Sequence, residues 1–380
     1  MPGILKLEKM MKSRLLDVVG DAMNLVRNSR VAEATVLLRT ALSRENASAR
    51  QEDPSASQSH PAQAFVPRPP RRLGDVLRVL RQARSASPRP LAPETTEAEA
   101  STVRFSSRNY RGAAGSLNYR LYVPDRLNRQ DTALVLMLHG CTQNPEDFAL
   151  GTRMNALADE FGLIVAYPSQ PRSANPSSCW NWFDKRHQQR GAGEPAKLAG
   201  LARELANEFG VKQERIFAAG LSAGGAMAEV LAATYPDIFD AVGVHSGLPY
   251  RAASDAPSAF AAMKGGAKAQ HTQPANTGNC RKIIFHGGSD GTVHPANSER
   301  ILEQVRQGAN RLKRVDLEWE VQGGRINRTM LQENDGRSVL EYWFVEDGGH
   351  AWFGGDQRGS YTQDVGLDAS RAMLRFFLKQ

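Results

Sequence analysis

The sequence predicts an α/β fold in which helices cover both faces of a mostly parallel sheet. Two observations support it: short, unbroken apolar runs of strand length recur from about residue 133 onward, and stretches of helical periodicity separate them. Strands buried on both faces are unbroken in their apolar residues, and their alternation with helices indicates a parallel sheet. The 380 residues, 41% of them hydrophobic, are enough for one large core and an appendage.

The predicted elements follow one another from residue 102 onward. Segments 102–107 and 117–123 alternate like the strands of an antiparallel hairpin, joined through 111–115. The further strands are expected at 133–138, 163–167, 215–219, 241–245, 282–285 and 338–344. The helices are expected at 146–161, 194–209, 226–235, 295–310 and 369–379. Residues 102–380 should therefore form one catalytic domain.

The first hundred residues differ in composition and predict a helical and disordered N-terminal extension. Residues 1–45 carry an approximately helical apolar stripe, which predicts a helical hairpin. Residues 46–101 are expected to be a low-complexity linker rich in Ser, Ala and Pro, with a possible short helix at 73–83.

The extension is also basic, since residues 1–100 hold 16 Lys and Arg against 11 Asp and Glu. An amphipathic, basic segment predicts contact with a polymer granule or a membrane surface through residues 1–100. The alternative is a poorly ordered tail without a partner. No nucleic-acid partner is expected, because no zinc-finger spacing or base-stacking pattern accompanies the charge. No signal peptide is visible, which favours a cytoplasmic location, or an extracellular one if the start site differs.

A G-x-S-x-G motif at Gly220–Gly224 is the most informative local feature. It lies between the apolar strand at 215–219 and the helical run at 226–235, and a strand, a tight turn and a helix form the nucleophile elbow of α/β-hydrolases. Ser222 is the predicted nucleophile. The motif arises by chance in about one chain in eight of this length, so a Gly-rich turn with an idle serine is the alternative.

An acid and a histidine follow Ser222 in the order that α/β-hydrolases use. Asp290 lies in a Gly-rich turn after the strand at 282–285, and His350 lies in a Gly-rich loop after the strand at 338–344. Asp290 is expected to orient His350, the general base. His245 is the rival base, although it precedes the acid in the chain, and His286 is interpreted as a core histidine.

The turn after the strand at 133–138 predicts an oxyanion hole. Its residues His139, Gly140 and Cys141 bring backbone amides toward the elbow. The N–H groups of Cys141 and Ala223 are the expected donors, and the side chain of His139 is expected to be buried.

These motifs together resemble the polyhydroxybutyrate depolymerase family of esterases, over about residues 103–378. The segments that carry the resemblance are 138–143, 179–183, 191–200, 220–225, 243–248 and 349–352. It implies an α/β-hydrolase domain with Ser222, Asp290 and His350 as the triad, acting on short-chain polyhydroxyalkanoate polymers or oligomers without a metal or organic cofactor.

Three other functions are weighed beside this one. Related enzymes of the same group act on feruloyl or acetyl esters of plant polysaccharides, so a feruloyl or acetylxylan esterase is the alternative enzyme. A catalytically idle hydrolase scaffold, serving a binding extension, is the alternative of another class. A peptidase is disfavoured because no propeller or lid domain accompanies the predicted core.

The resemblance also guides expectations for aromatic and cysteine residues. Trp180, Trp182, Trp352 and Tyr167 are the expected lining of an apolar ester groove, with one of the first two buried and Trp352 facing the pocket. Cys141 and Cys179 both lie in family motif segments, which favours a disulfide between them and leaves Cys280 free. Three reduced thiols are the alternative.

Overall fold

The computed structural model describes residues 104–379 except 129–130, 267–279, 309–311 and 322–323. The helical hairpin expected at 1–45 and the linker expected at 46–101 lie outside the described residues. Within the described part, no helix combines the length and the apolar character needed to span a bilayer.

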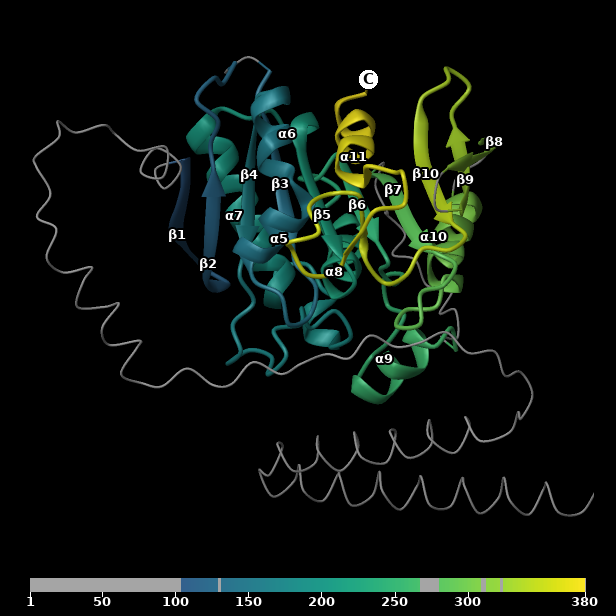
Figure 1. Ribbon diagram of the computed structural model, residues 1–380. Helices are drawn as coiled ribbons and strands as arrows, with labels where there is room; N and C mark the ends of the chain where they lie inside the picture. Colours follow the sequence, from purple (N-terminus) through teal and green to yellow (C-terminus); the bar gives the residue numbers. More distant parts are fainter. Residues whose placement is uncertain (1–103, 129–130, 267–279, 309–311, 322–323, 380) are drawn as a thin grey trace, which may run out of the picture. The chain divides into compact units, whose positions relative to one another are not determined.

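A ten-stranded sheet organises the described residues (Figure 1), in the order β1-β2-β4-β3-β5-β6-β7-β10-β9-β8. The strands β4, β3, β5, β6, β7 and β10 run parallel, as predicted, and antiparallel strands flank them on both sides. The bounds are β1 Phe105–Gly112, β2 Gly115–Tyr122, β3 Ala133–Leu138, β4 Leu163–Pro168, β5 Ile216–Leu221, β6 Ala241–His245, β7 Arg281–Gly287, β8 Lys313–Val321, β9 Gly324–Gln332 and β10 Ser338–Val345. A small parallel ribbon pairs β11 (Trp352–Phe353) with β12 (Thr362–Gln363).

Helices cover both faces of the sheet, because successive residues of its central strands point to opposite sides. In β3, Leu134 and Leu136 belong to the core under α7 and α8, whereas Val135 and Met137 belong to the core under α6 and α11. The helices are α5 Pro145–Thr152, α6 Met154–Phe161, α7 Gly193–Phe209, α8 Ala223–Thr234, α9 Ala256–Met263, α10 Ala296–Gly308 and α11 Ala369–Leu378, with short 3₁₀ turns η1 Lys185–His187 and η2 Gln213–Arg215.

Three local features differ from the sequence prediction. The single helix expected at 146–161 is two helices, because Arg153 adopts a left-handed conformation (φ 53°) that ends α5. The first hairpin is longer than expected and turns at 113–114. The antiparallel pair β8–β9 was not predicted. The apolar residues Val315, Leu317, Trp319 and Val321 nevertheless alternate with polar ones, which is typical of a strand that exposes one face to solvent.

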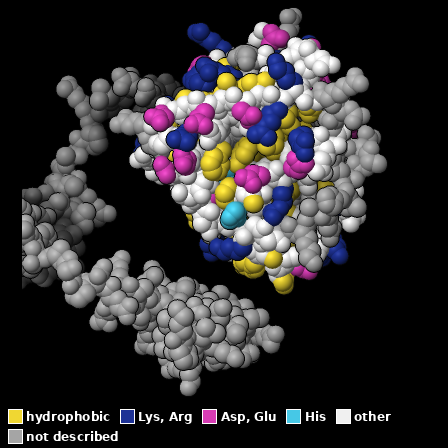
Figure 2. Space-filling model, turned by 90° about the vertical axis from the view of Figure 1, so that its right-hand side faces the viewer, with side chains coloured by type: hydrophobic (Ala, Val, Ile, Leu, Met, Phe, Trp, Pro, Cys, Tyr) yellow, Lys and Arg dark blue, Asp and Glu magenta, His cyan; other side chains and the backbone are white. Residues whose placement is uncertain are grey.

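The outermost strand, β8, leaves apolar side chains at the surface. Leu317 is 46% exposed, and Trp319 and Val321 on the same strand are partly exposed. Figure 2 shows a band of apolar side chains, with acidic and basic ones around it, on this side of the molecule. The helix α11 packs against β6 and β7, and the outer strands extend beyond it.

The parallel strands bring several loops to one edge of the sheet. The carboxyl ends of β3, β5, β7 and β10 lead into the segments that hold the predicted oxyanion loop, Ser222, Asp290 and His350. Ligands of open α/β sheets bind outside the carboxyl ends of the strands. This edge is therefore the candidate site.

Candidate active site

The turn between β5 and α8 holds Ser222 in a strained backbone conformation, with φ 57° and ψ −117°. A non-glycine residue in such a conformation persists only where its surroundings enforce it. Here the start of α8 lies directly against the end of β3, since a Cβ on Gly224 would overlap the carbonyl group of Leu138. This close backbone contact lifts Ser222 out of the sheet edge, where its side chain is partly exposed.

The predicted acid and base meet by a direct hydrogen bond. His350 Nδ1 lies 2.7 Å from Asp290 Oδ2, across 60 residues of sequence. The two loops pack backbone to backbone, because a Cβ on Gly287 would overlap the carbonyl of Gly348 and because Ser289 N–H donates to that carbonyl at 2.9 Å. The side chain of His350 is 12% exposed and that of Asp290 is fully buried.

Asp290 is a buried carboxylate that donors surround. Its Oδ1 accepts the N–H groups of Thr292 and Val293 at 2.9 and 2.8 Å. His286 Nε2 lies 3.4 Å from Oδ2, the oxygen that also contacts His350. Burial by itself raises the pKa of Asp290, but hydrogen bonds from His286 and His350 outweigh it and hold this pKa well below its ordinary range. Asp290 is therefore ionised and can fix the tautomer and orientation of His350.

Some backbone N–H groups of the loop after β3 donate hydrogen bonds within the protein, and others have no acceptor. Gly140 N–H donates to the side chain of Gln143 at 2.9 Å, and Thr142 N–H donates to Ser177 O at 2.7 Å. Among the described residues, the N–H groups of Cys141 and Ala223 have no acceptor. A Cβ on Gly140 would lie 3.7 Å from Ser222 Cβ, so this loop passes next to the elbow. Two N–H groups without an acceptor thus belong to the backbone segments that adjoin Ser222.

Three residues to which the sequence analysis assigned no role hold this loop in place. Gln143 Nε2 donates to Asp147 Oδ2 and to the carbonyl and hydroxyl of Ser360, each at 3.1 Å. Asp147 accepts the N–H of Ser360 at 2.9 Å and its hydroxyl as well. No motif marks Ser360 in the sequence, because its partners lie more than 200 residues away.

The cysteines form the predicted pair. Cys141 and Cys179 are joined by a disulfide, with their Cα atoms 4.2 Å apart, and Cys280 is free. Burial raises the pKa of the Cys280 thiol to about 12. The disulfide ties the oxyanion loop to the long segment between β4 and α7, so it restrains the backbone of Cys141 from a second side.

The other candidate histidines are buried. His245 has no exposed surface, and its Nε2 accepts the N–H of Phe353 at 3.0 Å. His139 bonds Gly140 O through Nδ1 and accepts Gln170 N–H through Nε2. His286 is likewise buried, between Ser298 and the carbonyl of Val293. His350 is thus the histidine that both contacts the acid and reaches the surface of the site.

The expected aromatic lining is corrected by the structure. Trp180, Trp182, Trp352 and Tyr167 are all buried. Trp352 donates to Ser370 Oγ at 3.0 Å and stacks on His245, and Tyr167 donates to Asn155 Oδ1 at 2.7 Å. Burial of both Trp180 and Trp182, rather than one, follows from the disulfide-bonded segment folding back onto the core. The presence of tryptophan in a segment does not by itself show whether its side chain lines a substrate groove or packs in the core.

An aromatic side chain that the sequence analysis missed lies next to the oxyanion loop instead. Tyr361 is 47% exposed, and its hydroxyl is 3.3 Å from Thr142 Oγ1.

In the described part of the chain, no group of three His, Cys, Asp or Glu is placed to hold a metal ion.

Comparison with known proteins places this geometry in context. Residues 117–312 match the protein family described as Esterase PHB depolymerase. The chain is 29% identical to poly(3-hydroxyalkanoate) depolymerase C of Paucimonas lemoignei, over 71% of this chain and 68% of that protein. It is 31% identical to feruloyl esterase B of Neurospora crassa, over 58% of this chain and 79% of that protein. An acetyl xylan esterase from Aspergillus awamori shares the fold, with a TM-score of 0.56 at 20% identity, over 72% of this chain and 99% of that one.

The buried histidines predict a loss of stability in mild acid. Burial lowers the pKa of His139 and lowers that of His245 further, below the ordinary 6.5, so the unfolded chain binds more protons than the folded one. Stability should be complete above about pH 6.5 and fall at lower pH, by about 1 kcal/mol per pH unit for each such histidine. Urea unfolding at pH 7.5 and 5.5 measures the difference.

Two variants test this explanation, one at a buried histidine and one, as the control, at an exposed histidine. His245→Gln should reduce the loss between the two pH values, whatever its effect on stability at pH 7.5. His294→Gln, at an exposed position, should leave the loss unchanged. An equal pH dependence in both variants would show that His245 is not the group that titrates.

Proposed function

The chain belongs to the PHB depolymerase family of esterases and is a serine carboxylic ester hydrolase, and on that premise we propose that Ser222, His350 and Asp290 perform its chemistry on short-chain hydroxyalkanoate polyesters or oligomers. The observation that carries the residue assignment is the 2.7 Å bond between Asp290 and His350 at the edge where the elbow holds Ser222. The family and the ester-hydrolase activity make an idle scaffold the weaker hypothesis.

The reaction begins with attack of Ser222 Oγ on the ester carbonyl. His350 Nε2 accepts the hydroxyl proton, since its Nδ1 already donates to Asp290, and the ionised Asp290 stabilises the resulting imidazolium. The tetrahedral intermediate then loses the alcohol, which takes the proton from His350, and an acyl-serine remains. Water repeats the sequence in reverse, with His350 as the base, and releases the acid and free Ser222.

The negative charge of each tetrahedral intermediate falls on the former carbonyl oxygen. The free N–H groups of Cys141 and Ala223 are the donors for it, and the second of these begins α8, where the helix dipole also favours negative charge. Gln143, the disulfide and Ser360 keep the loop fixed before substrate arrives, so little reorganisation is needed when charge develops.

The substrate class rests on the relatives rather than on the triad, which is common to many esterases. The name of the Paucimonas relative specifies a poly(3-hydroxyalkanoate), and its sequence similarity covers more of this chain than that of the Neurospora relative, 71% against 58%. A feruloyl esterase is the second candidate, because the Neurospora relative is slightly more identical over a shorter segment.

We also propose that residues 1–100 bring the enzyme to a polymer granule or a membrane surface. Their positive charge and their helical apolar stripe support this role.

Removal of the nucleophile or the base should abolish activity without unfolding the protein. Ser222→Ala and His350→Ala should each lower kcat on p-nitrophenyl butyrate by at least about 10³-fold. Both side chains lie at the surface of the site, so the thermal midpoint should change little. A mild effect of His350→Ala beside a severe one of His245→Ala would show that the base is misassigned.

Parallel assays distinguish the two substrate classes. Purified full-length protein should cleave p-nitrophenyl butyrate and hydroxybutyrate oligomers, with a kcat/KM on the oligomers at least about tenfold above that on methyl ferulate. Ser222→Ala measures the background. The reverse order of rates would reject the polyester hypothesis in favour of a feruloyl esterase.

The role of the extension has its own test. A shortened chain beginning at Ser101 should keep its kcat on p-nitrophenyl butyrate and bind polyhydroxybutyrate granules or anionic vesicles less well in a sedimentation assay. Unchanged sedimentation would remove the proposed role, and lost turnover would show that the extension contributes to the catalytic domain.

A further inference from the structure

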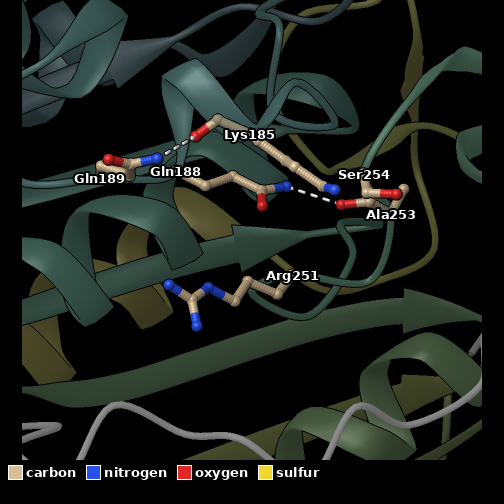
Figure 3. Close-up of a pocket in the computed structure, with 6 residues that line it drawn as sticks. All are labelled: Lys185, Gln188, Gln189, Arg251, Ala253 and Ser254. Carbon is tan, nitrogen blue, oxygen red and sulfur yellow. Dashed lines mark hydrogen bonds between the residues drawn. The ribbon is translucent and has the colours of Figure 1, made fainter.

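A polar cavity lies among the loops at the carboxyl edge of the sheet, apart from the residues of the candidate active site. It has a volume of about 240 Å³, and its lining is Lys185, Gln188, Gln189, Arg251, Ala253 and Ser254 (Figure 3). We call it the cationic pocket. One wall comes from the segment between β4 and α7, and the other from the segment after β6, the strand next to the one that carries Ser222.

The lining of this pocket is cationic. Lys185 and Arg251 line it and no acidic residue does, and in the part of the chain that the structure describes neither cation has a carboxylate within ion-pair distance. Asp255, next to the lining residue Ser254, interacts with Lys185 at longer range: hydrogen bonds from Ser258 and the charge of Lys185 lower its pKa. Neighbouring arginines behave differently, since Arg186 pairs with Asp184 at 2.6 Å and Arg190 pairs with Asp237 at 2.5 Å. Two unpaired cations around one cavity favour an anionic ligand.

Hydrogen bonds between its two walls hold the cationic pocket in shape. The buried side chain of Gln188 joins its two walls, because Nε2 donates to Trp182 O at 2.7 Å and to Ala253 O at 2.8 Å. Tyr250 donates to the backbone carbonyl of Gln188 at 2.7 Å, and the guanidinium of Arg251 lies 5.1 Å from the ring centre of Tyr250. Figure 3 shows the carboxamide oxygen of Gln188 turned toward the side where Arg251 lies.

Arg251 itself is held in a left-handed conformation, with φ 58°. An arginine does not adopt this conformation freely, so the surrounding contacts enforce it. Arg251 therefore extends from a constrained backbone position beside the wall that Gln188 holds, and its guanidinium is suited to binding a carboxylate.

We propose that the cationic pocket binds the free terminal carboxylate of a hydroxyalkanoate oligomer, an inference that rests on the proposed polyester function. In such an oligomer, the alcohol that leaves during acylation is itself a hydroxy acid and carries the carboxylate end. Hydrolysis adds water across the ester: the acyl carbon–oxygen bond breaks, the leaving oxygen takes the proton from His350, and a hydroxy acid departs. The pocket therefore selects chains by their acid end.

This assignment separates polyester oligomers from the second substrate class. The alcohol that leaves from a feruloyl or acetyl ester of a neutral sugar has no carboxylate to occupy the pocket. For such substrates Lys185 and Arg251 would have no role in the reaction. An enzyme without the proposed contact would also cleave a hydroxybutyrate oligomer equally fast with a free or a methyl-esterified carboxyl end.

The test compares a hydroxybutyrate trimer as the free acid with the same trimer capped as a methyl ester. The quantity measured is the ratio of the two kcat/KM values on the full-length enzyme at pH 7.5, which cancels any general loss of activity. The wild-type ratio should favour the acid by about tenfold, the scale of one charge-assisted contact. The double variant Lys185→Gln, Arg251→Gln should bring the ratio to about one, whereas Arg251→Lys should keep most of the preference.

Arg186→Gln is the matched control, since it removes a neighbouring cation that does not line the pocket, and it should keep the wild-type ratio. Equal rates on acid and ester in the wild type would overturn the pocket assignment while leaving the polyester function intact. A preference that survives in the double variant would also overturn it. Activity on p-nitrophenyl butyrate without cleavage of either trimer would reject the polyester function, and with it this role of the pocket.

Discussion

The close backbone contact between the start of α8 and the end of β3 is the constraint on which the site depends. Because Gly224 lies against the carbonyl of Leu138 without room for a side chain, the chain must turn sharply at Ser222. The same turn leaves the amide of Ala223 unpaired and brings the loop of Cys141 beside the serine. One steric condition therefore positions the proposed nucleophile and both proposed oxyanion donors.

The second requirement is a carboxylate that stays ionised while fully buried. Desolvation opposes the charge of Asp290, and the structure compensates with donors on both oxygens: two backbone amides, His350 and, more distantly, His286. This arrangement explains why His286 lies so near the acid without reaching the surface. It supports the carboxylate, whereas His350 connects the carboxylate to the site.

The segment between β4 and α7 links features that are far apart in the sequence. It carries Cys179, which restrains the oxyanion loop through the disulfide, and it carries Lys185 and Gln188 of the cationic pocket. Its tryptophans pack inward and anchor it to the core. A segment held this firmly can present a recognition surface at the same edge of the sheet as the candidate site, with little ordering cost when substrate binds.

The sequence by itself determined the parallel core and the alternation of its strands and helices, and it singled out Ser222, Asp290 and His350 as the proposed triad, because these depend on local apolar patterns and short motifs. Only the tertiary structure decided the features that depend on distant partners. Ser360 supports a loop more than 200 residues away, and Arg251 and Gln188 line one pocket from two different segments. Burial separated core tryptophans from the exposed Tyr361. A side chain's type specifies what it can bind, but its surroundings specify whether it faces substrate or core.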